Sequence, residues 1–392
     1  MTQGEMAAII DLNEEDDALR PLTAYRPVGT LPFAGRYRLL DFPLSAVAHA
    51  GVHSVALFMP RSARSVQDHV RDGSSWNLDL IQGGVFMFPY MATRDYSDSQ
   101  LRHRYFDDYT TFLRRSGAPY TVIIGSRNVA SVDLAAVLAY HQAGDAPVTV
   151  VYKKLAEAEM APSDWTLTLS EQGTASAVVP TEARREPADA DGKVPSFMDT
   201  YLLATPDLID ILDAAAENDT FRPLPALLRD YVIANNANAF EYTGYLARIT
   251  SLQRYFDYSL GMLDEANYQA LLFSAVPVLT KSKNEVPTFF ARTAKVENSL
   301  LGTGSYIEGQ INHSVIFRSV VVHQGAAVDN SVIMQGGKIA NGSKLSNVIL
   351  DKGVVIGPNL TLAGTPDQPL VIGKNQTILS AADIPQAAAT KA

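Results

Sequence analysis

Residues 297–359 read ENSLLGTGSYIEGQINHSVIFRSVVVHQGAAVDNSVIMQGGKIANGSKLSNVILDKGVVIGPN. Pairs of aliphatic residues recur about every five to six positions, as at 315–316 and 320–321 and again at 348–349 and 354–355, and glycine or asparagine residues separate them. This repeat is typical of a hexapeptide β-helix, whose coils turn at the small residues and stack aliphatic side chains inward. A β-sandwich of short strands is the alternative. We predict a left-handed parallel β-helix over residues 296–378.

The chain before this repeat alternates short apolar runs with stretches of helical periodicity. The runs at 6–10, 54–58, 120–124 and 148–152 predict buried strands, and the stretches at 44–50, 105–115 and 133–143 predict helices. This rhythm predicts an α/β domain with a mostly parallel sheet over residues 1–260. We expect a connector over 261–295 and a disordered tail over 379–392. The charged, proline-bounded segment 181–195 predicts a surface loop.

Composition excludes several classes of protein. A formal net charge of −10 argues against a general nucleic-acid binder, which needs a basic surface. With no cysteine, the chain can form neither disulfides nor cysteine-ligated metal sites. No apolar run approaches the ~20 residues that span a bilayer, and the first residues lack a secretory signal. We therefore expect a cytoplasmic protein that is not bound to a membrane.

A long block near the N-terminus carries a specific resemblance. Residues 20–23 are RPLT, and residues 31–45 are LPFAGRYRLLDFPLS. This block, together with MDTY at 198–201 and NSVIMQ at 330–335, resembles the bacterial ADP-glucose pyrophosphorylase (glucose-1-phosphate adenylyltransferase) family. The resemblance implies a Rossmann-like nucleotidyltransferase domain followed by a β-helix. Catalytic members of this family join ATP to glucose 1-phosphate, which releases pyrophosphate and makes ADP-glucose for glycogen or starch.

The phosphate-binding loop that this resemblance implies is missing. Active members carry a glycine-rich loop after the first strand, because glycine lets backbone N–H groups approach phosphate oxygens. Residues 11–20 here are DLNEEDDALR, without glycine, and the arginine of the loop falls on Ala18. Five carboxylates stand where a triphosphate would lie: Asp11, Glu14, Glu15, Asp16 and Asp17. The alternative is that these acids only cap the next helix; either interpretation removes the phosphate cradle.

Three further catalytic features of the family are replaced. The lysine behind the triphosphate falls on Val28, and no lysine precedes Lys153. The lysine segment that grips the sugar phosphate should lie near residue 180, where the chain reads AVVP at 177–180. The Gly-Thr-Ala segment that contacts the nucleotide and sugar is unrecognisable at 100–105.

The resemblance places the two metal-binding aspartates on Arg127 and Arg248. A shift of one residue would place the first on Ser126 instead. Mg²⁺ requires hard oxygen ligands. An arginine about 5 Å from a dication would cost roughly 6–7 kcal/mol at an effective dielectric constant near 20. We therefore predict no catalytic residues, no metal ion and no cofactor.

Arginines of the preserved block are candidates for an effector site. Arg26 and Arg38 match effector-binding arginines of the family, and Arg36 matches a lysine there. The resemblance implies that this segment lines a cleft for phosphorylated metabolites, for which arginine is well suited. A further basic position of the family falls on Pro32. The alternative is that these arginines form ion pairs with residues such as Asp41.

These substitutions resemble the GlgD type of this family, which are non-catalytic regulatory members. The leading hypothesis is a regulatory subunit in a hetero-oligomer, expected to be a tetramer, with a catalytic ADP-glucose pyrophosphorylase in glycogen biosynthesis. Such a subunit would act by shifting the partner's conformational equilibrium. Two alternatives remain: a weak nucleotidyltransferase acting alone, and a free-standing sensor of sugar phosphates or nucleotides.

Overall fold

The chain forms two compact units, each assembled from several segments. A computed structural model describes residues 4–60, 63–90, 99–218 and 220–385. The sheet unit comprises Met1–Glu14, Phe42–Leu246 and Ser274–Leu279; the β-helix unit comprises Glu15–Asp41, Ala247–Phe273 and Thr280–Ala392. The boundaries predicted at residues 260, 295 and 378 divide the chain linearly, whereas these units follow spatial proximity.

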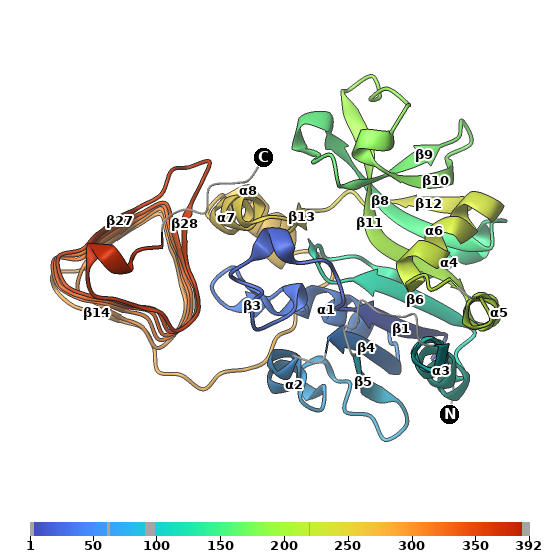
Figure 1. Ribbon diagram of the computed structural model, residues 1–392, viewed down its shortest axis with the longest axis horizontal. Helices are drawn as coiled ribbons and strands as arrows, with labels where there is room; N and C mark the ends of the chain where they lie inside the picture. The colour runs from blue at the N-terminus through green and yellow to red at the C-terminus, as the bar shows by residue number, and fades with distance from the viewer. Residues whose placement is uncertain (1–3, 61–62, 91–98, 219, 386–392) are drawn as a thin grey trace. The chain divides into compact units, whose positions relative to one another are not determined.

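A nine-stranded mixed sheet forms the centre of the sheet unit (Figure 1). Its order is β5 (Gly84–Tyr90), β4 (Ser54–Pro60), β1 (Met6–Asp11), β6 (Tyr120–Gly125), β11 (Lys193–Ala204), β8 (Val148–Ala156), β12 (Ala237–Glu241), β10 (Thr174–Pro180) and β9 (Trp165–Leu169). Strands β5, β4, β1 and β6 are parallel, as are β8 and β12. Strand β11 runs antiparallel to both neighbours. The sheet is therefore parallel on one side and mixed on the other.

Helices cover both faces of this sheet. The helices of the sheet unit are α1 (Asp41–His49), α2 (Arg64–Val70), α3 (Ser99–Ser116), α4 (Leu134–Ala143), α5 (Thr205–Ala216) and α6 (Leu224–Asn235). Apolar residues of α3, α5 and α6 share one buried cluster with β1, β4, β6 and β8. Helix α4 packs on β8, β11 and β12, and the Asp133 carboxylate caps it by accepting from the Ala136 N–H at 3.0 Å. An N-cap of this kind satisfies a backbone donor that has no partner within the helix.

The predicted strands and helices of this region are confirmed, with two differences. Helix α3 begins at Ser99, before the predicted residue 105. The predicted loop over 181–195 is shorter, because β10 ends at Pro180 and β11 begins at Lys193. The apolar alternation at the start of β11 was hidden by the charged residues that precede it.

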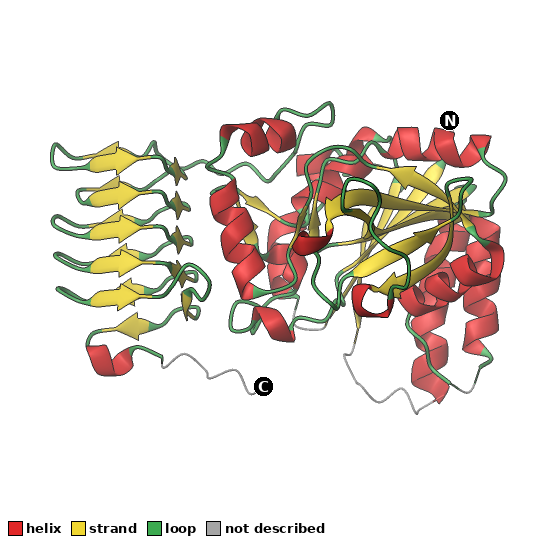
Figure 2. Ribbon diagram, turned by 90° about the horizontal axis from the view of Figure 1, so that it is seen from above, coloured by secondary structure: helices red, strands yellow, loops and turns green. Residues whose placement is uncertain are grey.

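Parallel coils make up the β-helix of the second unit, so the β-sandwich alternative is wrong. Figure 2 shows the coils stacked as successive rungs. The coils form three parallel sheets. The first contains β14 (Phe289–Phe290), β17 (Tyr306–Ile307), β20 (Val321–Val322), β23 (Lys338–Ile339), β26 (Val355–Ile356) and β29 (Thr377–Ile378). The second contains β15 (Lys295–Glu297), β18 (Gln310–Asn312), β21 (Ala327–Asp329), β24 (Lys344–Ser346) and β27 (Thr361–Ala363). The third contains β16 (Leu300–Leu301), β19 (Val315–Ile316), β22 (Val332–Ile333), β25 (Val348–Leu350) and β28 (Leu370–Ile372).

Aliphatic residues of successive coils fill the interior of the left-handed β-helix. Ile316, Ile333 and Leu350 are paired in register and fully buried. Positions 17 residues apart stack on neighbouring coils, as in the hydrogen bond from the Ser331 N–H to the Ser314 hydroxyl. Each coil thus buries its apolar side chains only against its neighbours, which is why the repeat was visible in the sequence.

The remaining segments of the β-helix unit are short. They include β2 (Pro32–Phe33) paired with β3 (Tyr37–Arg38), the strand β13 (Ala247–Arg248), and the helices α7 (Leu252–Gly261) and α8 (Glu265–Leu272). In the predicted tail, Ala381–Asp383 form a 3₁₀ turn, and residues 386–392 lie outside the described part of the chain. No helix among the described residues has the length and apolar character needed to span a membrane.

Candidate functional site

A buried carboxylate lies at the carboxyl end of the parallel sheet. Strands β1 and β6 end side by side, with Asp11 in register with Gly125. Beyond them, Glu14 Oε1 accepts hydrogen bonds from the N–H groups of Ser126 at 2.9 Å and Arg127 at 3.1 Å. Glu14 Oε2 accepts from the Ser126 hydroxyl at 2.5 Å, and the Arg127 Nε lies 3.4 Å from Oε1. Both oxygens of this carboxylate are therefore held by donors.

Glycine at position 125 permits this contact. A Cβ atom there would lie 3.0 Å from Glu14 Oε1 and 2.9 Å from the Asp199 Cβ. Asp199 in turn accepts from the Asn128 amide at 3.2 Å. A cavity lined by Gly125, Asn128 and Met198, among others, has about 20 Å³, which is room for one water molecule. The polar cluster around Glu14 thus borders a small cavity with a mostly apolar lining.

The carboxyl group of Asp11 has a raised pKa in this cluster. Its Oδ1 accepts from the N–H and the side-chain amide of Asn13. Withdrawal of the Asp11 carboxyl from water, with a smaller contribution from the negative charge of Glu14, raises its pKa to about 6. Asp11 is therefore partly protonated near pH 6, while an unfolded chain would ionise it near pH 4.

We expect Asp11→Asn to remove a pH dependence of stability. In the wild type, the unfolded state loses the Asp11 proton first as pH rises from 4 to 6, so folding becomes less favourable by about 2–3 kcal/mol over this interval. Above pH 6.5 both states are ionised and this contribution is constant. Urea unfolding at pH 4, 5, 6 and 7 should show D11N equal to wild type at pH 4 and more stable at pH 7. If the free energy of unfolding depended on pH in the same way in D11N and in wild type, the raised pKa of Asp11 would be contradicted.

The other residues predicted to mark lost catalytic positions belong to the β-helix unit. Val28 is 1% exposed in a 3₁₀ turn (Val28–Thr30), where it packs as a core residue. Arg248 is 2% exposed at the end of β13. Neither side chain supplies an oxygen ligand.

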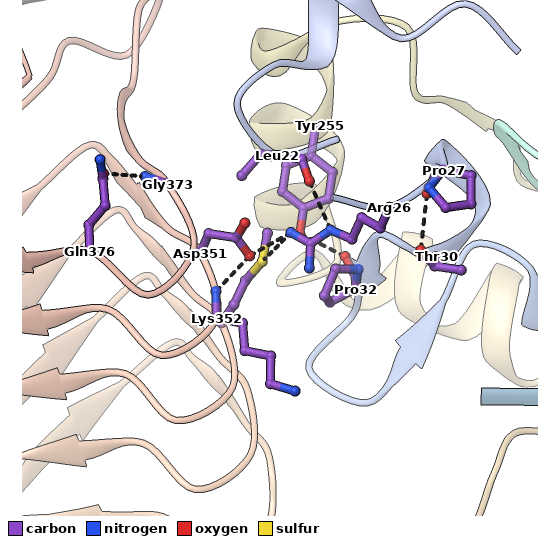
Figure 3. Close-up of polar contacts among 11 residues, drawn as sticks. Leu22, Arg26, Pro27, Thr30, Pro32, Tyr255, Asp351, Lys352, Gly373 and Gln376 are labelled. Carbon is purple, nitrogen blue, oxygen red and sulfur yellow. Dashed lines mark hydrogen bonds and ion pairs between the residues drawn. The ribbon is translucent and has the colours of Figure 1, made fainter. Parts of the chain in front are cut away.

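Arg26 forms a buried ion pair within the β-helix unit (Figure 3). Its Nη2 lies 2.5 Å from Asp351 Oδ1, and the two side chains are 9% and 1% exposed. The Arg26 Nε also donates to the Leu22 carbonyl at 2.8 Å. The alternative that an arginine of the block forms an ion pair is thus correct for Arg26, but its partner is Asp351. Asp41 instead accepts from the Arg38 N–H at 3.0 Å and the Thr280 hydroxyl at 2.5 Å.

Several cations interact electrostatically with Lys352, which follows Asp351 in the chain. Partial withdrawal from water and the positive charges of Lys374, Arg38, Arg318 and Arg26 lower the pKa of Lys352. Lys283 is also affected: withdrawal from water, then Lys281, Arg318 and Arg38 lower its pKa. We call Arg26, Arg38, Lys283, Arg318, Lys352 and Lys374 the basic cluster. The basic cluster contains two of the three predicted effector arginines, Arg26 and Arg38. The third, Arg36, is exposed at the turn between β2 and β3.

Sequence reasoning missed the part of the basic cluster that the β-helix contributes. Arg318 and Lys352 occupy equivalent corners of their coils: the Gly336 N–H bonds to the Arg318 carbonyl, and the Asn375 N–H to the Lys352 carbonyl. The 17-residue repeat relates such positions, so aligning the coils would have revealed Arg318 and Lys352 on one corner, with Gln335 at the equivalent position between them. Their convergence on Arg26 and Arg38 depends on tertiary structure.

This cluster is chemically suited to a multivalent anion. Crowded ammonium and guanidinium groups repel one another, and an anion that binds them relieves this repulsion. Arg26 and Arg318 are already engaged with Asp351 and Glu285. Lys283 and Lys352, by contrast, are exposed and can turn toward a ligand; Lys352 is drawn with its side chain extending away from Asp351 in Figure 3.

Two family models match the chain. The nucleotidyl transferase model matches residues 17–160, and the GlmU-like C-terminal hexapeptide model matches residues 286–368. The second match coincides with the coils of the β-helix.

Whole-length relatives carry a more specific description. The chain is 30% identical over 374 residues to the glycogen biosynthesis protein GlgD of Bacillus subtilis (strain 168), covering 95% of this chain and 97% of that protein. It is 32% identical over 371 residues to the glycogen biosynthesis protein GlgD of Geobacillus stearothermophilus, covering 94% and 96%. It is 26% identical over 353 residues to the glucose-1-phosphate adenylyltransferase of Bacillus cytotoxicus, covering 88% and 89%.

Proposed function

The chain belongs to the family of the glycogen biosynthesis protein GlgD and glucose-1-phosphate adenylyltransferase, and we propose that it acts in glycogen biosynthesis as a regulatory subunit without catalytic activity of its own. Its partner is a catalytic glucose-1-phosphate adenylyltransferase in a cytoplasmic hetero-oligomer. The observation that carries this proposal is the ion pair between Arg127 and Glu14 at the end of β6.

The residues at the expected metal positions do not fit Mg²⁺. Arg127 places a cation where the resemblance requires an aspartate, and Ser126, the alternative position, donates its hydroxyl to Glu14. Arg248 is a second cation, almost fully buried. Mg²⁺ needs oxygen ligands in near-octahedral geometry, and a guanidinium supplies none. We therefore derive no catalytic step through a metal ion in this chain.

The basic cluster supports a regulatory role. A phosphorylated metabolite bound by Arg38, Lys352 and Lys374 would bridge the N-terminal segment and the β-helix of one unit. Such a ligand would bind most tightly to the conformation of this unit in which the cations lie closest together, and it would therefore stabilise that conformation. Regulation of the partner requires that this arrangement differ in its contacts with the catalytic subunit.

Co-purification with a catalytic adenylyltransferase tests the proposal. We expect a stable complex in which the partner's turnover or its response to phosphorylated effectors changes several-fold, while the purified chain alone releases no pyrophosphate from ATP and glucose 1-phosphate. Native mass measurement would give the stoichiometry, with a tetramer expected. A control complex made with K338A/K344A, which removes two exposed lysines from other faces of the β-helix, should behave as wild type.

Three results would contradict the proposal. A partner whose turnover and effector response are the same with and without this chain would exclude the regulatory role. Mg²⁺-dependent pyrophosphate release by the chain alone, abolished by Ser126→Ala, would show that it is an enzyme. Ligand binding by a chain that ignores the catalytic partner would favour a free-standing sensor.

A further inference from the structure

The groups around Glu14 have the composition of an oxyanion site. They comprise two successive backbone N–H groups, the Ser126 hydroxyl and the Arg127 guanidinium. Successive backbone N–H groups that point at one place form an anion-binding concavity, and a guanidinium adds a charged partner. The Glu14 side chain is 12% exposed and that of Arg127 is 22% exposed, so these contacts are shielded from water.

The sequence near Glu14 explains why one carboxylate of the acidic segment reaches this place. Residues 12–14 lead out of β1, whose last residue Asp11 is in register with Gly125. Three residues beyond that point suffice to bring the Glu14 side chain over the end of β6. The absence of a Cβ at Gly125 leaves room for its oxygen. Asp16 and Asp17, in contrast, lie near Arg20.

We propose that Glu14 is an internal ligand that fills an oxyanion-binding position formed by Ser126 and Arg127, and that this position takes a carboxylate or a phosphate ion once the Glu14 side chain is removed. This inference rests on the proposed function. An enzyme that bound the phosphate of its substrate here would need the position open, whereas a chain without catalytic activity does not. The Glu14 carboxylate thereby holds the ends of β1 and β6 as a bound anion would, without needing a nucleotide.

Because Glu14 is part of the chain, the wild-type position should not bind free anions. A group linked through a short segment competes at an effective concentration on the order of millimolar or higher. A free acetate or phosphate ion has the same chemistry but must compete from solution. Removing the side chain leaves the donors unsatisfied, and buried donors without partners favour any small anion that fits.

The experiment uses the full chain carrying Glu14→Ala. We expect its Tm to fall by about 4–8 °C, from the loss of charged hydrogen bonds. Sodium acetate or sodium phosphate, added at constant ionic strength, should raise the Tm of this variant saturably by about 3 °C or more. Wild type and Glu171→Ala, which removes an exposed carboxylate of the same unit, should show no such saturable rise.

Two further variants assign the response to this position. Adding Arg127→Gln to E14A should abolish the rise in Tm. The phosphate titrations of E14A and of both controls are made on chains that also carry K352A/K374A, so that binding to the basic cluster does not contribute.

A folded E14A that gains no stability from either anion would overturn the proposal. If E14A does not fold, the same titrations are made on Glu14→Ser, whose short side chain also leaves the position open, and acetate should stabilise it where wild type is unaffected; no response in E14S would also overturn the proposal. Both results leave the co-purification test of the regulatory role unaffected, since they concern only anions and the isolated chain.

Discussion

Replacing Asp351 with alanine is expected to destabilise the β-helix unit by about 3–5 kcal/mol, because it leaves the Arg26 charge buried without its counterion. Asp351 is 1% exposed at a corner of the β-helix, and its carboxylate also accepts from the Lys352 N–H at 2.6 Å. Hydrogen exchange of peptides from β22, β25 and β26 would report this loss within the unit.

The double variant R26M/D351L provides the decisive comparison. It removes both charges and replaces them with apolar groups, so we expect it to be more stable than D351A despite carrying one more substitution. The exposed pair Arg114–Asp213, with side chains 57% and 51% exposed, serves as the control. Asp213→Ala should cost less than about 1 kcal/mol. A D351A cost as small as that of D213A would show that water reaches the Arg26 pair.

The architecture could be predicted from the sequence where it depends on local repetition. In the β-helix, each buried position such as Ile333 contacts the same position of the next coil, so periodicity alone reveals the core. Four strands of the sheet, β1, β4, β6 and β8, were also recognisable from their apolar runs. The antiparallel direction of β11 was not, because a buried strand reads the same whether its neighbours are parallel or antiparallel.

The candidate site was predictable only in part, for a similar reason. The missing glycines and the positions of Val28 and Arg127 follow from the resemblance of the sequence to the family. Which of five acids would dock on Arg127 depends on the geometry at the end of β1 and β6, and the structure selects Glu14. Asp351 lies 325 positions from Arg26, and no local pattern connects them.

Removing two lysines of the basic cluster should weaken anion binding about 100-fold. Lys352→Ala and Lys374→Ala each delete an ammonium group from the cluster, and one charge-assisted contact is worth about 1.5 kcal/mol or more, which is roughly tenfold in affinity. Calorimetric titration with inorganic pyrophosphate would measure the dissociation constants of wild type and K352A/K374A. Because Glu14 closes the other oxyanion position in both proteins, the titration reports the cluster alone.

Charge placement, and not net charge, should determine this affinity. The control K338A/K344A has the same net charge as K352A/K374A, but its lysines lie on β23 and β24 of the other two sheets. Its affinity should match wild type; equal weakening of the two double variants would mean that pyrophosphate responds only to overall charge. The pH dependence gives a second check. A lysine is charged below its pKa, and withdrawal from water together with neighbouring cations lowers the pKa of Lys352, so wild-type affinity should decline at a lower pH than ordinary lysines would allow.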